Sequence, residues 1–306
     1  MAEVAIVWNP SKTSREDLEA ALPEGAGEVS WFETSEDDPG RGAAGAALDA
    51  GASVIVAAGG DGTVRAVAER LAEGAEAELA IVPLGTGNLL ARNLDVPLND
   101  LAGALERAFE GEARAIDLGW VEAEIEGERL RRAFSVMAGF GIDAHMIVET
   151  DEDLKSKVGW LAYVESLGRA VNASEVVDFD LAVDGGEAEA TAGHTFIVGN
   201  CGTIQAGITL LPDADPYDGE LDCLLLSAEG LGGWLDTLRS YVWDNGIRRV
   251  FKKHERAEDG ATTEHARARK LDVRLSRPRV LEIDGEDLGE TEAFTVEVQA
   301  GAVRVR

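Results

Sequence analysis

Two glycine-rich stretches of this sequence carry residue types that suit phosphate chemistry. The first is GGDGTV, from Gly59 to Val64, and the second is PLGTGNLLARNL, from Pro83 to Leu94. Glycine lets the backbone approach a ligand closely, and unpaired N–H groups at the start of a helix bind anions. No G-x-x-x-x-G-K-[ST] motif occurs in the chain, and the first stretch does not fit G-x-G-x-x-G. We therefore predict a phosphate site that uses neither of these common loops.

Each glycine stretch follows a predicted strand and precedes a predicted helix. The runs Ser53–Ala58 and Leu79–Val82 are short and apolar, which is typical of buried parallel strands, and helical spacing begins after each turn. Parallel strands joined by crossover helices bring their carboxyl ends to one edge of the sheet. We expect both glycine turns to face one ligand there. A first strand, Val4–Val7, brings Asn9 and Lys12 toward the same edge.

Asp61 lies inside the first turn, where an uncompensated carboxylate would repel a phosphate group. We expect a cation or a hydroxyl donor between the two negative groups. The alternative is an ordinary strand–helix turn with an exposed aspartate. The presence of a second such turn one strand later favours the nucleotide site.

Length, composition and charge limit the function further. The chain has 306 residues, 45% of them hydrophobic, which is enough for two globular domains with a core each. A net charge of −30 argues against nucleic acid as a partner, but a few local cations and Mg²⁺ can still hold a nucleotide. We find no basic leader segment and no apolar run long enough for a membrane span, so we expect a cytoplasmic protein. Cys201 and Cys223 are expected to be buried thiols.

The second part of the chain has a different pattern of predicted secondary structure. From about Ile116, short strand-like runs alternate with Gly, Asp and Pro turns, which indicates an antiparallel β-sandwich. We therefore predict an α/β nucleotide-binding domain over residues 1–116 and a β-sandwich domain over residues 117–299. The sandwich is expected to bind the substrate.

Seven segments resemble one family, in that family's order. GGDGTV and PLGTGNLLARNL resemble the diacylglycerol kinase catalytic domain and the related bacterial lipid kinases. The further matching segments are Ile6–Pro10 (IVWNP), Ala138–Ala144 (AGFGIDA), Leu154–Val164 (LKSKVGWLAYV), Leu211–Asp222 (LPDADPYDGELD) and Ile283–Glu286 (IDGE). The resemblance covers nearly the whole chain.

The resemblance implies a fold and an activity. The implied fold is a nucleotide domain like those of phosphofructokinase and NAD kinase, completed by residues 300–306, together with an antiparallel β-sandwich. The implied activity is that of a transferase of phospholipid metabolism: a lipid kinase that uses ATP and Mg²⁺ to phosphorylate the hydroxyl of a diacylglycerol-like or sphingoid lipid. Such an enzyme would be cytoplasmic and peripheral to the membrane, and a homodimer is an open alternative to a monomer.

The resemblance also implies roles for individual residues. Asp61 would organise Mg²⁺ or the acceptor hydroxyl, Glu286 would be the general base, and Asp215 and Asp218 would hold a structural Mg²⁺. The implied nucleotide-binding residues are Asn9, Lys12, Gly59, Gly60, Gly62, Thr63, Gly85, Thr86, Gly87 and Asn88.

Simpler interpretations of these residues stay open. Asn9 can be a plain turn residue and Lys12 a solvated lysine. Asp284 and Gly285 are a standard hairpin turn signal, which leaves Glu286 either on the surface or in the site. The loop of Asp215 and Asp218 can be a solvated acidic turn.

Two further features bear on the substrate. The family commonly has an acidic residue after the asparagine of the second turn, where this chain has Leu89. A basic cluster at residues 248–256, with Lys155 and Lys157 elsewhere, could contact anionic head groups or phosphate. An NAD kinase and a non-catalytic nucleotide or lipid sensor are the competing functions.

Overall fold

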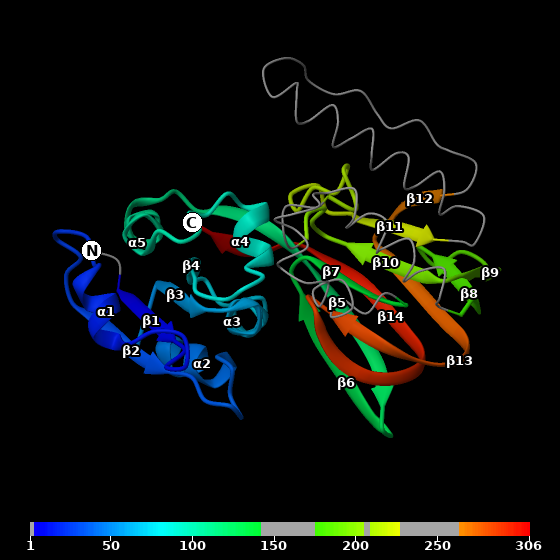
Figure 1. Cartoon of the computed structure of the whole chain (residues 1–306), viewed down its shortest axis with the longest axis horizontal. Coiled ribbons are helices and arrows are strands. Elements are labelled where there is room, and N and C mark those ends of the chain that lie inside the picture. The colour runs from blue at the N-terminus through cyan, green and yellow to red at the C-terminus, as the bar shows by residue number, and fades with distance from the viewer. Residues whose placement is uncertain (1–2, 142–174, 205–208, 227–262) are drawn as a thin grey trace, which may run out of the picture.

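The fold is known from a computed structural model, and the structure describes residues 3–141, 175–204, 209–226 and 263–306. The sequence pattern predicts further helices at 155–171 and 231–242, and both lie outside the described residues. The lysines 155 and 157 and the basic cluster at 248–256 lie outside them too. Two units lie side by side, an α/β unit built from the first part of the chain and a β-rich unit built from the rest (Figure 1).

The α/β unit is a parallel sheet with helices packed on it. The strand order is β4-β3-β1-β2, and every pair in it is parallel. Its strands are β1 (Val4–Trp8), β2 (Val29–Glu33), β3 (Val54–Gly59) and β4 (Glu78–Pro83), and its helices are α1 (Arg15–Ala20), α2 (Arg41–Asp49), α3 (Asp61–Leu71), α4 (Leu89–Asn93) and α5 (Leu101–Glu110).

The apolar runs of the sequence explain this arrangement. All six residues of β3 are buried, as expected for a central parallel strand covered on both faces. Helices α2 and α3 contribute mostly alanine and valine to the core, and small side chains let the helices lie close to the sheet. The predicted strands Val4–Val7, Ser53–Ala58 and Leu79–Val82 are confirmed as β1, β3 and β4, and the helices expected after the two glycine turns are confirmed as α3 and α4.

The β-rich unit is a sandwich whose two layers meet at β13. One layer runs β6-β5-β14-β13-β8-β9, and the other continues from the end of β13 through β7-β10-β11-β12. The strands are β5 (Arg114–Ile125), β6 (Glu128–Phe134), β7 (Met137–Phe140), β8 (Val177–Val183), β9 (Glu189–Gly193), β10 (Thr195–Gly199), β11 (Leu221–Leu226), β12 (Thr263–Ala268), β13 (Lys270–Ile283) and β14 (Glu286–Val305).

Phenylalanine rings from both layers fill the space between them. The ring of Phe140 on β7 meets that of Phe179 on β8 edge-on, with centroids 5.4 Å apart, and Phe196 and Phe294 pack around the same pair. This is a separate core from that of the α/β unit. The predicted fold class, an α/β unit with an antiparallel β-sandwich, is confirmed.

Two strands join the units. The end of β14 pairs in parallel with β4, at Val305 and Leu79, after the earlier part of β14 has paired with β13 and β5 in the sandwich. Ile116, where we predicted the domain division, lies within β5. The buried carboxylate of Asp117 strengthens this junction, since it accepts hydrogen bonds from the N–H groups of Gly219 (2.7 Å) and Gly301 (2.6 Å).

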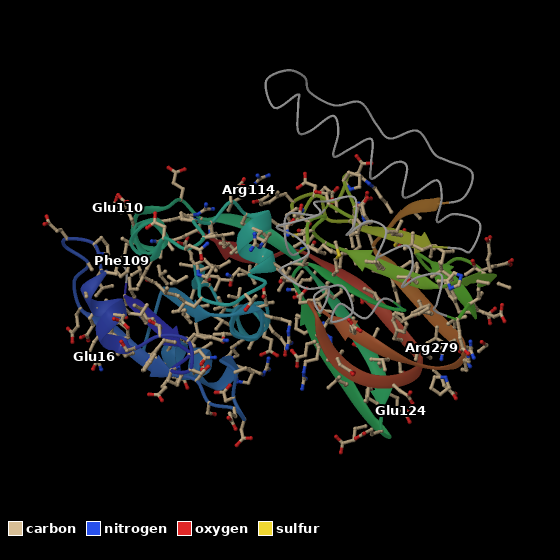
Figure 2. The ribbon with its side chains drawn as sticks, in the orientation of Figure 1. Glu16, Phe109, Glu110, Arg114, Glu124 and Arg279 are labelled. Atoms are coloured by element: carbon tan, nitrogen blue, oxygen red, sulfur yellow. The ribbon has the colours of Figure 1, made fainter. Side chains whose placement is uncertain are left out.

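Other features match the composition of the chain. Charged side chains cover the outer surface, with Glu16 and Glu110 at the far end of the α/β unit and Glu124 and Arg279 at the far end of the sandwich (Figure 2). Both cysteines are free and buried, as predicted. Among the helices of the described residues, none is both long and apolar enough to cross a bilayer.

The pH dependence of stability tests the packing of the sandwich at Asp222 on β11. Burial raises the pKa of this carboxyl to about 6, against the opposing charge of Arg267, and one carboxylate oxygen has no partner among the described atoms. A raised pKa means that its contribution to stability is complete below the unfolded-state pKa and is lost as the pH rises through about 6. We predict that Asp222→Asn is more stable than the parent at pH 7, by about 1–3 kcal/mol, and gains nothing at pH 4.

Urea unfolding between pH 4 and pH 8 measures this difference. Asp178→Asn, an exposed aspartate on β8, is the matched control and should follow the parent at every pH. Equal pH profiles for Asp222→Asn and the parent would show that Asp222 is ionised in the folded protein without penalty.

Candidate functional site

The two glycine turns touch each other above the sheet. The first turn (residues 59–63) follows β3 and the second (residues 83–88) follows β4, and these strands are parallel neighbours with Gly59 opposite Pro83. A Cβ placed on Gly85 would lie 2.7 Å from the Cα of Gly60, which is closer than real Cβ contacts allow. The turns therefore meet backbone to backbone, and this contact requires glycine at position 85.

The carboxylate of Asp61 holds the two turns together. One oxygen accepts the N–H of Asn88 at 2.8 Å and the other accepts the N–H of Leu89, so the side chain caps the start of α4. Asn88 adopts a left-handed backbone (φ 48°), and its own side chain bonds both the N–H and the carbonyl of Gly85. The second turn is thus fixed by hydrogen bonds from two side chains, those of Asp61 and Asn88.

This arrangement answers the electrostatic problem that Asp61 raised. Its charge is compensated by two backbone N–H groups of α4, where we had expected a cation or a hydroxyl donor, and the alternative of an exposed aspartate is wrong. Burial raises the pKa of the Asp61 carboxyl, the N–H of Leu89 lowers it, and the nearby charge of Asp284 raises it. The carboxylate is therefore held among backbone N–H groups, chiefly those of Asn88 and Leu89 in the second turn.

The start of α3 is open to an anion. Its N-cap residue, Gly60, makes no side-chain capping bond, and the first N–H groups of any helix lack acceptors within the helix. No atom beyond the local backbone lies within 4 Å of a Cβ placed on Gly62. Thr63 is only 3% exposed and packs under Gly59, so the turn offers its backbone, not that hydroxyl, to a ligand.

The other predicted nucleotide residues lie at the same edge with less definite roles. Asn9 follows β1, and its side-chain oxygen accepts the N–H (2.9 Å) and the hydroxyl (2.8 Å) of Ser11, which supports the turn interpretation. Lys12 and Thr86 are exposed. Gly87 lies against Asp61, since a Cβ placed there would be 2.6 Å from a carboxylate oxygen.

Glu286 follows a tight hairpin turn and faces the α/β unit. Asp284 and Gly285 have φ values of 48° and 82°, and Ile283 pairs with Glu286, which confirms the predicted two-residue hairpin. The Glu286 carboxylate forms an ion pair with Arg65 on α3. Because Arg65 lies four residues after Asp61, the structure brings both predicted catalytic acids to the first turns of one helix.

Asp284 is a residue that the sequence presented only as a turn former. Its carboxylate accepts the N–H groups of Ser135, Val136 and Met137, at 2.8–3.0 Å, and the hydroxyl of Ser135 at 2.9 Å. The apolar and β-branched pattern predicts a single strand over Arg131–Met137, and these bonds divide that stretch between β6 and β7. They also fix the hairpin that carries Glu286.

The predicted magnesium ligands are engaged by their own loop. Asp215 accepts the N–H of Tyr217 (3.1 Å), and Asp218 accepts that of Glu220 (3.0 Å) and pairs with Arg267 at 3.4 Å. Within the described residues no three acidic, histidine or cysteine side chains converge in a way that could hold a metal. In this arrangement the guanidinium of Arg267 occupies the place of a cation, and a structural Mg²⁺ at these residues stays a prediction.

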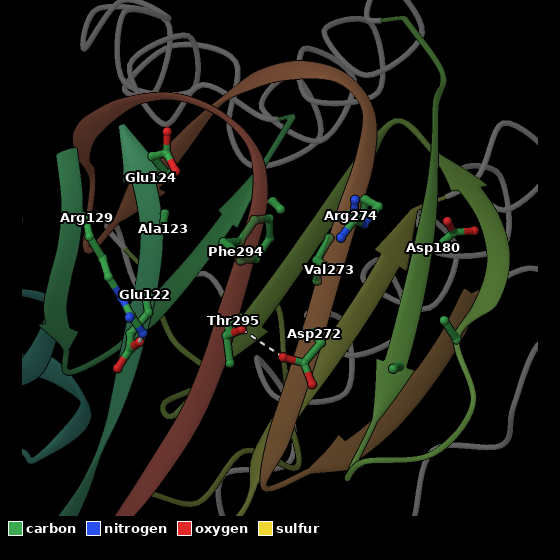
Figure 3. A pocket seen from close by; sticks show the side chains of 13 residues that line it. Glu122, Ala123, Glu124, Arg129, Asp180, Asp272, Val273, Arg274, Phe294 and Thr295 are labelled. Atoms are coloured by element: carbon green, nitrogen blue, oxygen red, sulfur yellow. Dashed lines mark hydrogen bonds and ion pairs between the residues drawn. The ribbon is translucent and has the colours of Figure 1, made fainter. Parts of the chain in front are cut away.

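A groove of about 540 Å³ lies elsewhere, on the outer face of the sandwich. Glu122, Asp272, Arg274 and Thr295 are among the residues that line it (Figure 3). Thr295 donates a hydrogen bond to Asp272 there. No residue of the glycine turns lines this groove, so we base the site on the turns and hairpin, where the chemistry lies, and not on the volume of a cavity.

Comparison with known proteins gives the family. The diacylglycerol kinase catalytic domain matches residues 8–121, and the YegS C-terminal NAD kinase beta sandwich-like domain matches residues 135–306. A "Probable lipid kinase YegS-like" of Pseudomonas aeruginosa is 32% identical over 315 aligned positions, which cover 99% of this chain and 93% of the relative. A diacylglycerol kinase of Staphylococcus aureus is 30% identical and covers 77% of this chain and 74% of its own length.

The fold is also found in a solved structure. The crystal structure of a diacylglycerol kinase from Bacillus anthracis superposes with a TM-score of 0.69 at 18% identity, covering 99% of this chain and 96% of that one. Together with the matches in sequence, this confirms the resemblance on which the prediction depended. The chain belongs to the lipid kinase family that joins a diacylglycerol kinase catalytic domain to a YegS-type sandwich-like domain.

Proposed function

We propose that this protein is an ATP- and Mg²⁺-dependent lipid kinase that phosphorylates the hydroxyl of a diacylglycerol-like or sphingoid lipid. The observation that carries the proposal is the open start of α3, which lies against a second glycine turn and beside a hairpin bearing a carboxylate. The names of the relatives support a lipid as the acceptor.

The phosphates of the nucleotide would lie over the first turn. The free N–H groups of α3 and the positive end of its dipole favour negative charge at this position, and Gly62 leaves room for close approach. The contact of Gly85 with Gly60 and the bonds of Asn88 would keep the second turn rigid along the same phosphates. Asn9 and Lys12 would extend the site along the sheet edge.

Magnesium would enter with the nucleotide. When bound, it neutralises charge on the phosphate oxygens during transfer. Both oxygens of Asp61 already accept hydrogen bonds from α4, so we assign Asp61 the task of holding the two turns around the phosphates.

Glu286 would receive the proton of the acceptor hydroxyl. One of its oxygens is held by Arg65, and the side chain is 54% exposed, so the second oxygen can meet a substrate. The lipid would approach from the membrane surface, with the protein bound peripherally. The protein would act as a monomer or a homodimer.

Two other functions lead to different results. An NAD kinase would convert NAD to NADP and ignore lipid alcohols. A nucleotide or lipid sensor would bind its ligand and transfer no phosphate. Assays with radiolabelled ATP, Mg²⁺ and either NAD or lipid alcohols in mixed micelles, over a range of salt concentrations, separate the three.

Glu286→Gln tests the general base. We predict that this change lowers kcat by about 10²–10⁴-fold and leaves the affinity for ATP unchanged, because it removes a proton acceptor and keeps the size of the side chain. Glu290→Gln, an exposed glutamate on the same strand, is the control and should keep full activity. Loss of activity in both variants, or in neither, would remove Glu286 from the mechanism.

Two glycine substitutions test the place of the phosphates. Gly62→Ala should fold with unchanged or slightly higher stability, because no atom meets the new methyl group and alanine favours the helix by up to about 1 kcal/mol. The same methyl group would occupy the approach to the N–H groups, so we predict at least a tenfold loss of ATP affinity by calorimetry.

Gly85→Ala should behave differently. Its methyl group meets the backbone of Gly60, so we predict a loss of about 1–3 kcal/mol in stability as well as weaker nucleotide binding. A Gly62→Ala protein that binds ATP as well as the parent would place the phosphates elsewhere.

A further inference from the structure

A buried arginine lies behind the proposed general base. The side chain of Arg65 is only 7% exposed, although charged residues are seldom buried so deeply unless they are paired. It is the fourth residue after Asp61 on α3, and its helix is fixed in the core by Val67 and Leu71. The position of its guanidinium is therefore set by the α/β unit.

The partners of Arg65 form a chain of alternating charges. One end of the guanidinium pairs with Glu286, and the other lies 3.9 Å from Glu69, which is 6% exposed. Glu69 also pairs with Arg41 at 3.1 Å and accepts the N–H of Ala133 at 2.9 Å. The buried charges are thus balanced. Because one guanidinium contacts both Glu286 and Glu69, moving Arg65 away from Glu286 would also weaken its contact with the buried Glu69.

Docking of the two units does not require this ion pair. Strands β5 and β14 run through the junction, and Asp284 fixes the hairpin through four hydrogen bonds of its own. What Arg65 adds is specific to the side chain of Glu286, which is 54% exposed in the presence of this ion pair. One carboxylate oxygen is held by Arg65, and the exposed fraction of the side chain leaves the other oxygen available to a substrate.

We propose that Arg65 is a positioning residue, which orients the Glu286 carboxylate toward the acceptor hydroxyl from the rigid helix that begins at the phosphate site. The inference rests on the proposed function, since it assumes that Glu286 accepts the proton. It adds a residue whose effect on the reaction passes through Glu286 alone.

A double-mutant cycle tests this dependence. The variants are Arg65→Met, Glu286→Gln and the pair together, with Arg65→Lys as the conservative change and Arg70→Met as the control. Arg70 lies on the same helix, is partly exposed and pairs only with Glu73 among the described residues. Steady-state kinetics with a diacylglycerol in mixed micelles gives kcat and KM for each substrate.

We expect Arg65→Met to lower kcat by about 10–100-fold with KM for ATP within twofold of the parent. Arg65→Lys should recover part of this loss, because it restores the charge without the planar fork. In the Glu286→Gln background, Arg65→Met should have no further effect on kcat. Arg70→Met should match the parent. Additive losses in the cycle would overturn the inference, and so would full activity of Arg65→Met.

A measurement without turnover gives a second readout. Amide hydrogen exchange over residues 283–288 should be the same in Arg65→Met, Arg70→Met and the parent, because Asp284 and not Arg65 fixes the hairpin backbone, and calorimetric binding of ADP with Mg²⁺ should also stay unchanged. Faster exchange in Arg65→Met would show that Arg65 holds the hairpin backbone and would contradict the inference. If Arg65→Met does not fold, Arg65→Gln/Glu69→Gln, which removes two opposite buried charges, replaces it in both measurements.

The outcomes separate this inference from the proposed function. If Glu286→Gln keeps full activity, the proposed general base is wrong. If Glu286→Gln has a lowered kcat but Arg65→Met does not, Glu286 remains the general base and the proposed role of Arg65 is wrong.

Discussion

The carboxylate of Asp61 bonded to the start of α4 is the interaction on which the rest of the site depends. The two N–H donors compensate the negative charge of Asp61, which would otherwise repel a phosphate. The same hydrogen bonds connect the second glycine turn to the first. The backbone contact of Gly60 with Gly85 requires that residue 85 lack a Cβ. One side chain thus holds the two turns together and has its own negative charge compensated by backbone N–H groups.

The proposed function requires a chain with a net charge of −30 to bind the polyanion ATP. The structure meets this demand locally. The start of α3 offers backbone N–H groups in place of lysines, and the acids nearest to it are each compensated, Asp61 and Asp284 by backbone N–H groups and Glu286 by Arg65. Backbone donors hold fixed positions in the fold, whereas exposed lysines do not, so a site of this kind stays preorganised.

Local patterns predicted much of this fold. Apolar runs marked β1, β3 and β4, and the glycine turns marked where the helices α3 and α4 begin. The sequence pattern predicts two strands, Leu271–Leu275 and Val280–Ile283, where the structure has the single strand β13 with a register shift between Arg274 and Arg279, around Pro278. The break between β6 and β7 was hidden for a related reason, since Asp284, almost 150 residues away, causes it.

The site followed the same rule. The two glycine turns could be placed on one sheet edge from sequence, because parallel topology dictates it. The partners of Asp61 and Glu286 could not, because the contact of Arg65 with Glu286 joins residues 221 positions apart and nothing in either segment announces it. Asp117 was missed in the same way. A lone aspartate beside a strand gives no sign that it will be buried and will bind two distant glycine N–H groups.

A crystal structure of the protein with Mg²⁺ and a non-hydrolysable ATP analogue tests the central claim most directly. The account predicts that the phosphates lie over Gly62 at the start of α3, while Asp61 keeps its hydrogen bonds to Asn88 and Leu89. Phosphates bound away from the first turn would contradict it, and so would an Asp61 that leaves α4 to coordinate the metal.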